Sequence, residues 1–131
     1  KSQSPREARQ HLSLTDQHQQ WIAAADTFFI ASSHPTGGVD ASHRGGPPGF
    51  VQILDRKRLS WPDYPGNTMF QSLGNIAENP RAGLLFIDFE QGGTLQLTGK
   101  AEILWDLEGT AELPGAERQI VFQIDRIVEI Q

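Results

Sequence analysis

The segment with the clearest chemical content is residues 40–46, which read DASHRGG. It places a hydroxyl, an imidazole and a guanidinium, those of Ser42, His43 and Arg44, next to two glycines. Residues two apart on an extended strand point to the same side, so Ser42 and Arg44 can hold one anion between them. Glycines let the backbone approach a ligand closely. The segment therefore predicts an anion-binding site, and the alternative is a polar loop with Arg44 in a surface ion pair.

A second anion-binding element is predicted where a helix begins at Asn67. A helix is expected over residues 67–78, because apolar side chains recur there at helical spacing and Asn79-Pro80 ends the pattern. The free N–H groups of its first turn and the positive end of its dipole favour a phosphate. Ordinary capping by Asn67 is the alternative interpretation.

Mostly strands surround these two elements. Turn residues between alternating or apolar runs predict two hairpins followed by three longer strands, with Gly99 as a bulge. About six antiparallel strands favour a small barrel over a sandwich, because a barrel leaves no unpaired edge. The fold class is therefore mainly β with a few short helices. The expected strands cover residues 27–32, 39–43, 50–55, 58–61, 81–89, 94–105 and 118–130.

The N-terminal part is expected to lie outside the barrel. Residues 1–13 are polar and lack periodicity, which predicts an arm or a short frayed helix. Thr15 is a good cap for a helix over residues 16–25. We therefore expect a single domain, with residues 1–26 as an N-terminal arm and helix and residues 27–131 as the barrel.

Composition limits the function classes. The chain has 131 residues, a net charge of −5 and a sequence pI near 5.2, which argue against nucleic acid as a partner. No apolar run approaches the roughly 20 residues that span a bilayer, and no signal-peptide pattern is present, so a soluble, cytoplasmic protein is expected. The sequence contains no cysteine, which excludes disulfides and thiolate chemistry.

Other groups of reactive side chains give weaker evidence for a functional site than residues 40–46 do. His11, His18, His34 and His43 lack metal-ligand spacing, so no metal site is predicted. Ser42 and His43 are adjacent, and on a strand they point to opposite faces, which argues against a serine hydrolase. No catalytic residue is identified from the sequence.

Four stretches of the chain resemble the FMN-binding split-barrel family related to pyridoxamine 5'-phosphate oxidase. In that family a strand bearing Arg or Lys precedes a strand that ends in a phosphate-binding turn. A short helix, Asn-Pro before a buried strand, and Gly-Lys/Arg-Ala then follow. The matching stretches are VDASHRGGPPGF at 39–50, LSWPDYPGN at 59–67, SLGNIAENPRAGLLF at 72–86 and LQLTGKAE at 95–102. The resemblance implies a six-stranded antiparallel split barrel that binds FMN.

The resemblance also implies which residues hold the flavin. Ser42, His43 and Arg44 correspond to side chains that bind the FMN phosphate and lie along the flavin. The backbone of Trp61, Pro62 and Asp63 is expected to border the isoalloxazine. The phosphate turn and its helix correspond to Asn67, Thr68, Gln71 and Ser72.

Two features of the family pattern concern charge and assembly. The oxidase carries a Ser-Arg-Lys cluster at the phosphate turn, whereas Asn67, Thr68 and Met69 include no cation, so here the phosphate would rest on fewer charges. Family members are homodimers with the flavin at the subunit interface. The resemblance therefore implies that Thr94 or Gln96 reaches the flavin of the other subunit.

These expectations lead to an FMN-dependent oxidoreductase acting on a small, unnamed substrate. The oxidase itself has a basic and aromatic C-terminal segment that grips its substrate, and residues 118–131 (RQIVFQIDRIVEIQ) show no such tail. We therefore expect that the chain is not a true pyridoxamine 5'-phosphate oxidase. Two alternatives remain: a non-catalytic module that holds flavin, haem or a deazaflavin, and an interaction domain whose pocket is vestigial.

Overall fold

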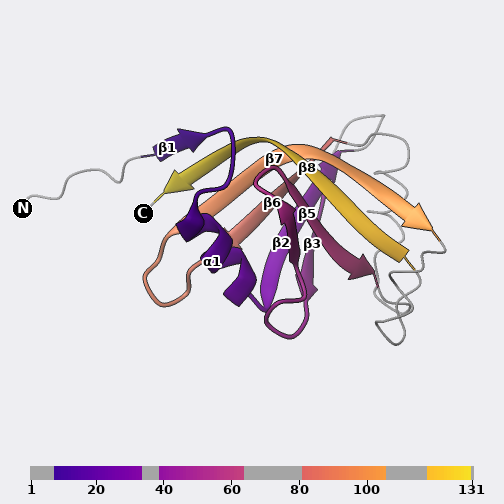
Figure 1. The fold of residues 1–131 in the computed structure, drawn as a ribbon, viewed down its shortest axis with the longest axis horizontal. Helices are drawn as coiled ribbons and strands as arrows, with labels where there is room; N and C mark the ends of the chain where they lie inside the picture. The colour runs from indigo at the N-terminus through magenta and orange to yellow at the C-terminus, as the bar shows by residue number, and fades with distance from the viewer. Residues whose placement is uncertain (1–7, 34–38, 64–80, 106–117, 131) are drawn as a thin grey trace, which may run out of the picture.

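A computed structural model describes residues 8–33, 39–63, 81–105 and 118–130 of the chain. These residues form one helix and eight strands, and every strand pairing is antiparallel (Figure 1). The mainly β fold class is thus confirmed. The elements are β1 (Ala8–His11), α1 (Asp16–Ala24), β2 (Thr27–Ser33), β3 (Val39–Gly45), β4 (Gln52–Asp55), β5 (Arg58–Asp63), β6 (Arg81–Ile87), β7 (Thr94–Trp105) and β8 (Arg118–Ile130).

The strands form a single curled sheet in the order β3-β2-β6-β7-β8-β5-β4, and β1 pairs with β8. Both predicted hairpins are present, as the pairs β2–β3 and β4–β5. Strand β8 is long enough to pair with two strands in addition to β7. Its first half pairs with β5 and its last four residues pair with β1. The predicted irregularity at Gly99 is also confirmed, because the register of β7 with β8 shifts between Thr98 and Gly99 and leaves Asp125 without a cross-strand partner.

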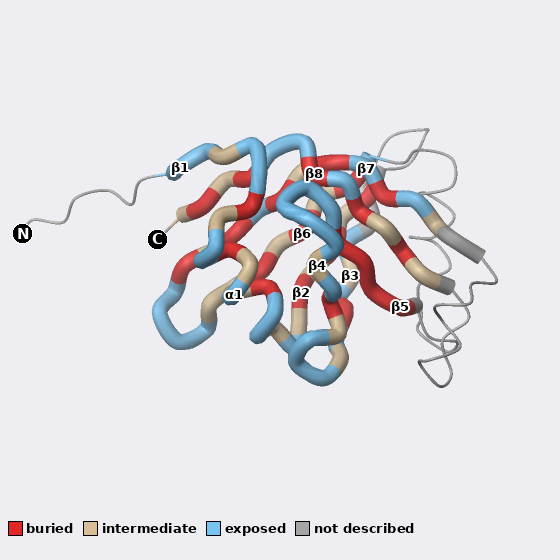
Figure 2. Tube along the Cα trace, in the orientation of Figure 1, coloured by how far each residue is buried: buried red, intermediate tan, exposed pale blue. Residues whose placement is uncertain are grey.

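The core lies on one face of this curled sheet, as Figure 2 shows by the alternation of buried and less buried residues along the strands. In β6 the pattern is regular, with Ala82, Leu84 and Phe86 buried and the residues between them half-buried. At its centre Phe28 packs edge-on against Trp61, with ring centroids 4.9 Å apart, and stacks on Phe86 at 5.1 Å. Such aromatic contacts add to the free energy of burial and fix the positions of β2, β5 and β6.

Helix α1 begins where the sequence predicts. The Thr15 hydroxyl accepts a hydrogen bond from the His18 N–H, and the Thr15 N–H donates to His18 Nδ1, each at 3.1 Å. This reciprocal capping box satisfies two donors of the first turn. The start of the helix is tied to the β4–β5 turn, because the Leu14 N–H donates to the Arg56 carbonyl at 2.7 Å and Arg56 Nη1 donates to the Leu14 carbonyl at 2.8 Å.

The expectation of an arm or helix over residues 1–13 is wrong for residues 8–11. Ala8–His11 is a strand, paired with residues 127–130 of β8. Backbone hydrogen bonds to the end of β8 order this segment, and such pairing needs no apolar periodicity in the segment itself. The seven expected ranges, which were counted as about six strands, correspond to β2–β8, and β1 is the eighth described strand. The helix predicted over residues 67–78 lies outside the described residues. Within the described part of the chain, no helix is long and apolar enough to cross a membrane.

Candidate functional site

Ser42 and Arg44 share the core-facing side of β3. In the β2–β3 register Arg44 lies opposite Phe28 and Ser42 lies opposite Ile30, and both of these β2 side chains are buried. Arg44 Nη1 donates to Ser42 Oγ at 3.4 Å. The spacing argument that places these two side chains together is therefore confirmed, and a hydroxyl and a guanidinium at this separation can both donate to one anion.

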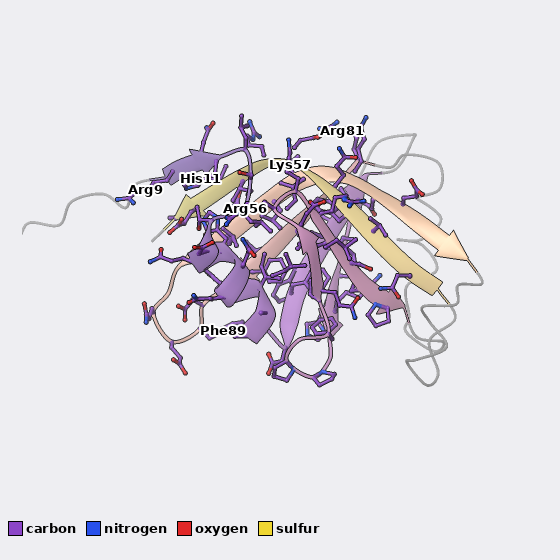
Figure 3. All side chains as sticks on the ribbon, in the orientation of Figure 1. Arg9, His11, Arg56, Lys57, Arg81 and Phe89 are labelled. Atoms are coloured by element: carbon purple, nitrogen blue, oxygen red, sulfur yellow. The ribbon has the colours of Figure 1, made fainter. Side chains whose placement is uncertain are left out.

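Burial sets Arg44 apart from the other described arginines. Its exposed fraction is 3%, whereas the side chains of Arg56, Arg58 and Arg81 are 58%, 53% and 55% exposed. Figure 3 shows Arg81 at the upper edge of the fold, and Arg56 lies in the exposed turn between β4 and β5. A surface ion pair is therefore not the role of Arg44. A cation shielded from water interacts more strongly with an anion than an exposed one does.

A third polar side chain, that of Ser32, faces the same side of the sheet. Ser32 is 2% exposed, and it lies opposite Asp40 in the register, diagonal to Ser42. Its Oγ has no hydrogen-bond partner among the residues that the structure describes. The sequence argument missed Ser32. The signal was available, because the alternation Phe28, Ile30, Ser32 puts a hydroxyl at a core-facing position of β2.

His43 points to the opposite face of β3. Its side chain is exposed, its Nε2 lies 3.3 Å from Thr27 Oγ1, and its ring centroid lies 5.7 Å from that of Phe29. The alternation that unites Ser42 with Arg44 separates His43 from them. His43 thus does not share the buried site.

The β5 residues of the predicted site behave differently from one another. Trp61 is fully buried and packs in the core against Phe28 and Phe122. Its side chain therefore does not line an open site. The expected contact with the isoalloxazine ring would have to come from the Trp61 backbone. Pro62 is buried, and Asp63 is the last residue of β5. Their place beside a flavin stays a prediction.

The two β7 residues lie over the outer face of the sheet. An apolar groove of about 300 Å³ runs across β2, β3, β6 and β7 on this face, and Gln96 lines it opposite Leu85. Thr94, opposite Ile87, is half-buried and lies one pair further along β7. Other side chains of the groove are those of Phe29, Ala31, Ala41 and Thr98. The predicted site residues are thus divided between the two faces of one sheet.

The remaining predicted residues, Asn67, Thr68, Gln71 and Ser72, lie outside the described residues, so the phosphate turn stays a prediction. In the β4–β5 turn, the Lys57 N–H and then the Arg58 side chain hold the pKa of the Asp55 carboxyl below its usual range. This carboxylate caps the turn. It lies on a different strand from the Ser42–Arg44 pair.

Solved structures of similar shape come from several bacteria. A Lactobacillus delbrueckii protein provisionally described as a pyridoxamine 5'-phosphate oxidase is 17% identical, with a TM-score of 0.70 over 89% of this chain and 94% of that one. An FAD-binding protein from Mesorhizobium loti is 16% identical, with a TM-score of 0.64 over 95% and 98% of the two chains. An FMN-binding protein from Syntrophomonas wolfei is 8% identical, with a TM-score of 0.59 over 86% and 88%. At these identities the likeness establishes the split-barrel fold.

No curated protein matches the chain by sequence. A family model does match, and it covers the helix, both hairpins and most of the last strand. The model is that of pyridoxamine 5'-phosphate oxidase, and the match extends over residues 14–125. Because the match spans most of the 131 residues, the chain belongs to the pyridoxamine 5'-phosphate oxidase family.

Proposed function

We propose that the protein binds FMN as a homodimer and is a flavin-dependent oxidoreductase that acts on a small substrate. The observation that carries the proposal is the contact between the buried Arg44 and the half-buried Ser42 on the core-facing side of β3. Family membership and the split-barrel fold support a flavin as the ligand. Neighbours described as FAD-binding and FMN-binding proteins support it further.

The residues present fit the phosphate end of FMN. Arg44 supplies a buried positive charge, and Ser42 supplies a hydroxyl beside it. The buried Ser32 Oγ, which makes no hydrogen bond within the described part of the chain, offers another donor on the same side of the sheet. Three donors with one full charge suit a phosphate monoester whose remaining contacts come from backbone N–H groups. When bound, FMN supplies the hydride and electron transfer, and the protein supplies its placement.

The division of the predicted site between two faces supports a dimer. Ser42 and Arg44 face the core side, whereas Gln96 lies on the outer face. One copy of the sheet does not present both sets from the same side. A second copy whose outer face approached the Ser42–Arg44 pair of the first would bring its Gln96 to the flavin that this pair holds. The half-buried apolar side chains of that face, Phe29 and Leu85 among them, suit such an interface.

The first test is whether the purified protein binds FMN and catalyses turnover of a substrate. The expected result is a yellow protein with one FMN per chain after removal of free flavin. Dithionite should bleach the bound flavin and an electron acceptor should restore it. Turnover of reduced nicotinamide cofactors with quinones or aldehydes would establish the oxidoreductase.

Three other outcomes of this test distinguish the alternatives. Bound flavin without turnover across that panel would favour a storage or sensing module. Preferential uptake of haem or a deazaflavin would replace FMN as the ligand. Protein that stays colourless after incubation with FMN, haem and a deazaflavin would refute the proposal.

The proposed interface predicts that Leu85→Glu disrupts the dimer. A carboxylate at this half-buried position in the centre of the apolar groove would have to be desolvated in the interface without a partner, so association should weaken at least tenfold. Sedimentation equilibrium of the wild type and the variant measures the effect. Gln52→Glu, which adds the same charge at an exposed position of β4, is the matched control and should remain dimeric. A Leu85→Glu protein that dimerises like the wild type would exclude this face as the interface.

A further inference from the structure

Four exposed side chains form a row across the outer face of the sheet. Arg58 of β5 lies opposite Gln123 of β8, which in turn lies opposite Lys100 of β7. Lys100 lies opposite Arg81 of β6. Because neighbouring strands are about 4.8 Å apart, the row spans roughly 14 Å. Three of its four members are cations, and the flavin site proposed above uses none of them.

Two further cations extend the row. Arg126 of β8 is exposed and lies opposite Thr98, two residues along β7 from Lys100. Lys57 is exposed in the β4–β5 turn, and its carbonyl accepts a hydrogen bond from the Ile124 N–H at 2.7 Å, which holds the turn against β8. The five cations, called here the basic band, are Lys57, Arg58, Arg81, Lys100 and Arg126.

The turn that carries Lys57 also borders a polar hollow. An open space of about 500 Å³ lies between this turn and β8, and it is lined by Asp55, Arg56, Lys57, Arg58 and Gln123. The Asp55 carboxylate fixes the shape of the turn, because it accepts hydrogen bonds from the Lys57 N–H and from Arg58 Nε, each at 2.8 Å. Paired strands and this turn hold the backbone of the cations in place, so a partner that binds them loses little affinity to ordering of the chain.

Three carboxylates lie among these cations and compensate part of their charge. Asp55 forms an ion pair with Arg58 at 2.8 Å, and Asp125 lies 3.5 Å from Arg81. Glu102 is exposed on the same side of β7 as the band. Five cations and three carboxylates give this face a net charge of +2, whereas the net charge of the whole chain is −5. The face therefore differs in sign from the rest of the molecule.

The excess charge belongs to three of the five cations. Lys57, Lys100 and Arg126 form no ion pair with any residue in the described ranges. Each is exposed, so its ammonium or guanidinium group is open to a partner in solution. These three side chains are the cations from which a negatively charged partner would gain most.

We propose that the basic band is a docking surface for an acidic segment of a partner protein. Side chains on one side of an extended segment recur about every 7 Å, so carboxylates of such a segment can face the cations along the roughly 14 Å row. A carboxylate beside Lys57 can also enter the polar hollow. Complementary charge steers the approach of such a partner and fixes its orientation.

The carboxylates within the band favour a protein over a nucleic acid or an anionic membrane. Both of those partners present phosphates over a wide area, and Asp55, Glu102 and Asp125 would repel part of such a surface. A protein can place its carboxylates against the cations and leave the three acids uncontacted or paired with cations of its own. The residues that line the hollow in the described part of the chain also include no aromatic ring on which a base could stack.

The basic band borders the apolar groove that is proposed as the dimer interface. Lys100 lies four residues along β7 from Gln96 of the groove, a separation of about 13 Å. The row of Arg58, Gln123 and Lys100 thus lies beside that interface rather than at its centre. Docking on the band does not depend on bound flavin, so its test is independent of the proposed function.

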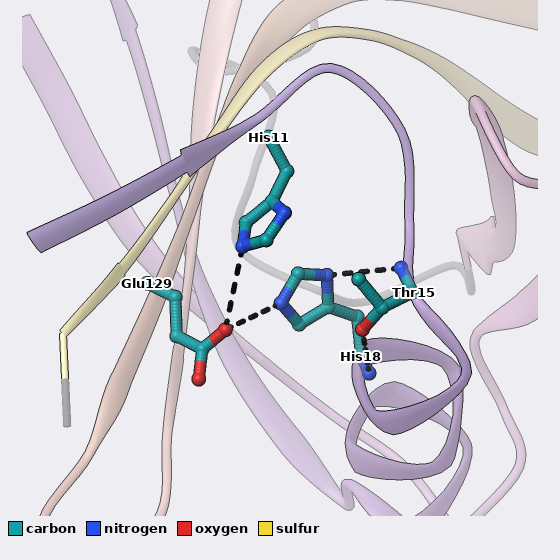
Figure 4. A network of polar contacts seen from close by, with 4 residues as sticks. All are labelled: His11, Thr15, His18 and Glu129. Carbon is teal, nitrogen blue, oxygen red and sulfur yellow. Dashed lines mark hydrogen bonds and ion pairs between the residues drawn. The ribbon is translucent and has the colours of Figure 1, made fainter.

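The other end of β8 provides a cation for the control. There the exposed Arg9 of β1 lies opposite Glu129, six residues or about 20 Å along β8 from Gln123. Figure 3 shows Arg9 well away from Arg81. The polar contacts near Glu129 hold the fold together: His18 Nε2 lies 2.7 Å from Glu129 Oε1, and His18 Nδ1 accepts a hydrogen bond from the N–H of the helix cap (Figure 4).

The experiment measures binding of a fluorescein-labelled oligoglutamate peptide to the full chain by fluorescence anisotropy. At an ionic strength of about 0.1 M, charges more than about 10 Å apart are largely screened, so local contacts dominate. The wild type should bind this peptide but not an oligoglutamine peptide of the same length. Lys100→Glu replaces an attraction by a repulsion and should weaken binding about fivefold to twentyfold, as should Lys57→Glu. Added salt should weaken binding to the wild type.

Arg9→Glu is the matched control, because it makes the same change in net charge outside the band and should alter the affinity by less than about twofold. Equal losses in Arg9→Glu and Lys100→Glu would overturn the proposal, and so would a wild type that does not bind oligoglutamate. Tighter binding of single-stranded oligothymidylate or of phosphatidylserine vesicles, lost in Lys100→Glu, would overturn the assignment to a protein partner. Sedimentation equilibrium should give the wild type and Lys100→Glu the same mass. A loss of self-association in Lys100→Glu would instead assign the band to the interface between copies.

Discussion

Arg44→Met is expected to weaken FMN binding by about tenfold to a hundredfold while the fold survives. The substitution removes a charge-assisted hydrogen bond of roughly 1.5–3 kcal/mol, and each 1.4 kcal/mol is a factor of ten in affinity. Methionine fills most of the volume of the arginine stem, so the packing next to Phe28 is largely kept. Because Arg44 is buried, water does not replace the lost interaction. Fluorescence titration of FMN, with circular dichroism to check folding, measures the effect.

Two comparisons show whether the loss concerns the phosphate. Riboflavin carries the same ring without a phosphate, so its affinity should be equal in the wild type and Arg44→Met. Arg81→Met removes an exposed arginine that lies 3.5 Å from Asp125, and it should leave FMN affinity unchanged. If Arg44→Met lowers FMN and riboflavin affinity equally, the residue supports the fold of the pocket rather than the phosphate. Unchanged FMN affinity would refute the placement of the phosphate at β3.

Sequence patterns within single segments predicted most of the fold. Such patterns determine whether a segment forms a strand or a helix and which of its side chains share a face. The alternation in residues 94–105 and 118–130 predicted β7 and β8 with the observed bounds, since long strands with one buried face carry a period of two. Thr15 marked the start of α1 through its capping hydroxyl. The same period of two placed Ser42 beside Arg44 and His43 on the far side.

Features that depend on pairing between distant segments were not predictable in this way. Strand β1 exists because the end of β8 offers it backbone partners, and its own residues carry no β pattern. His18 and Glu129 are 111 residues apart, so no spacing rule connects them. The division of the site between two faces likewise follows from the β2–β6–β7 register, which brings Gln96 opposite Leu85.

Gly99→Ala is expected to destabilise the protein by about 1–3 kcal/mol, which corresponds to a melting temperature roughly 4–12 °C lower. A Cβ at Gly99 would overlap the carbonyl oxygen of Gln123, and it would lie 2.9 Å from the carbonyl carbon and 3.1 Å from Phe122 Cζ. The overlapping atom belongs to the backbone of β8, so it cannot rotate away as a side chain could. Relief requires β7 and β8 to separate at the register shift, where Asp125 of β8 has no cross-strand partner in the register. Thermal unfolding without flavin measures the loss.

The matched control is Gly83→Ala on the neighbouring strand β6. A Cβ there would lie 3.7 Å from the Leu97 carbonyl oxygen, an ordinary contact, so the control should match or slightly exceed the stability of the wild type. Both substitutions add one methyl group to a glycine in a strand, so the difference between them isolates the close approach of β8. That approach allows Lys100 and Ala101 to resume pairing with Gln123 and Phe122 after the register shift. Equal stability of the two variants would show that β8 can move away from residue 99 without loss of stability. The close approach of β8 would then not explain why this position is a glycine.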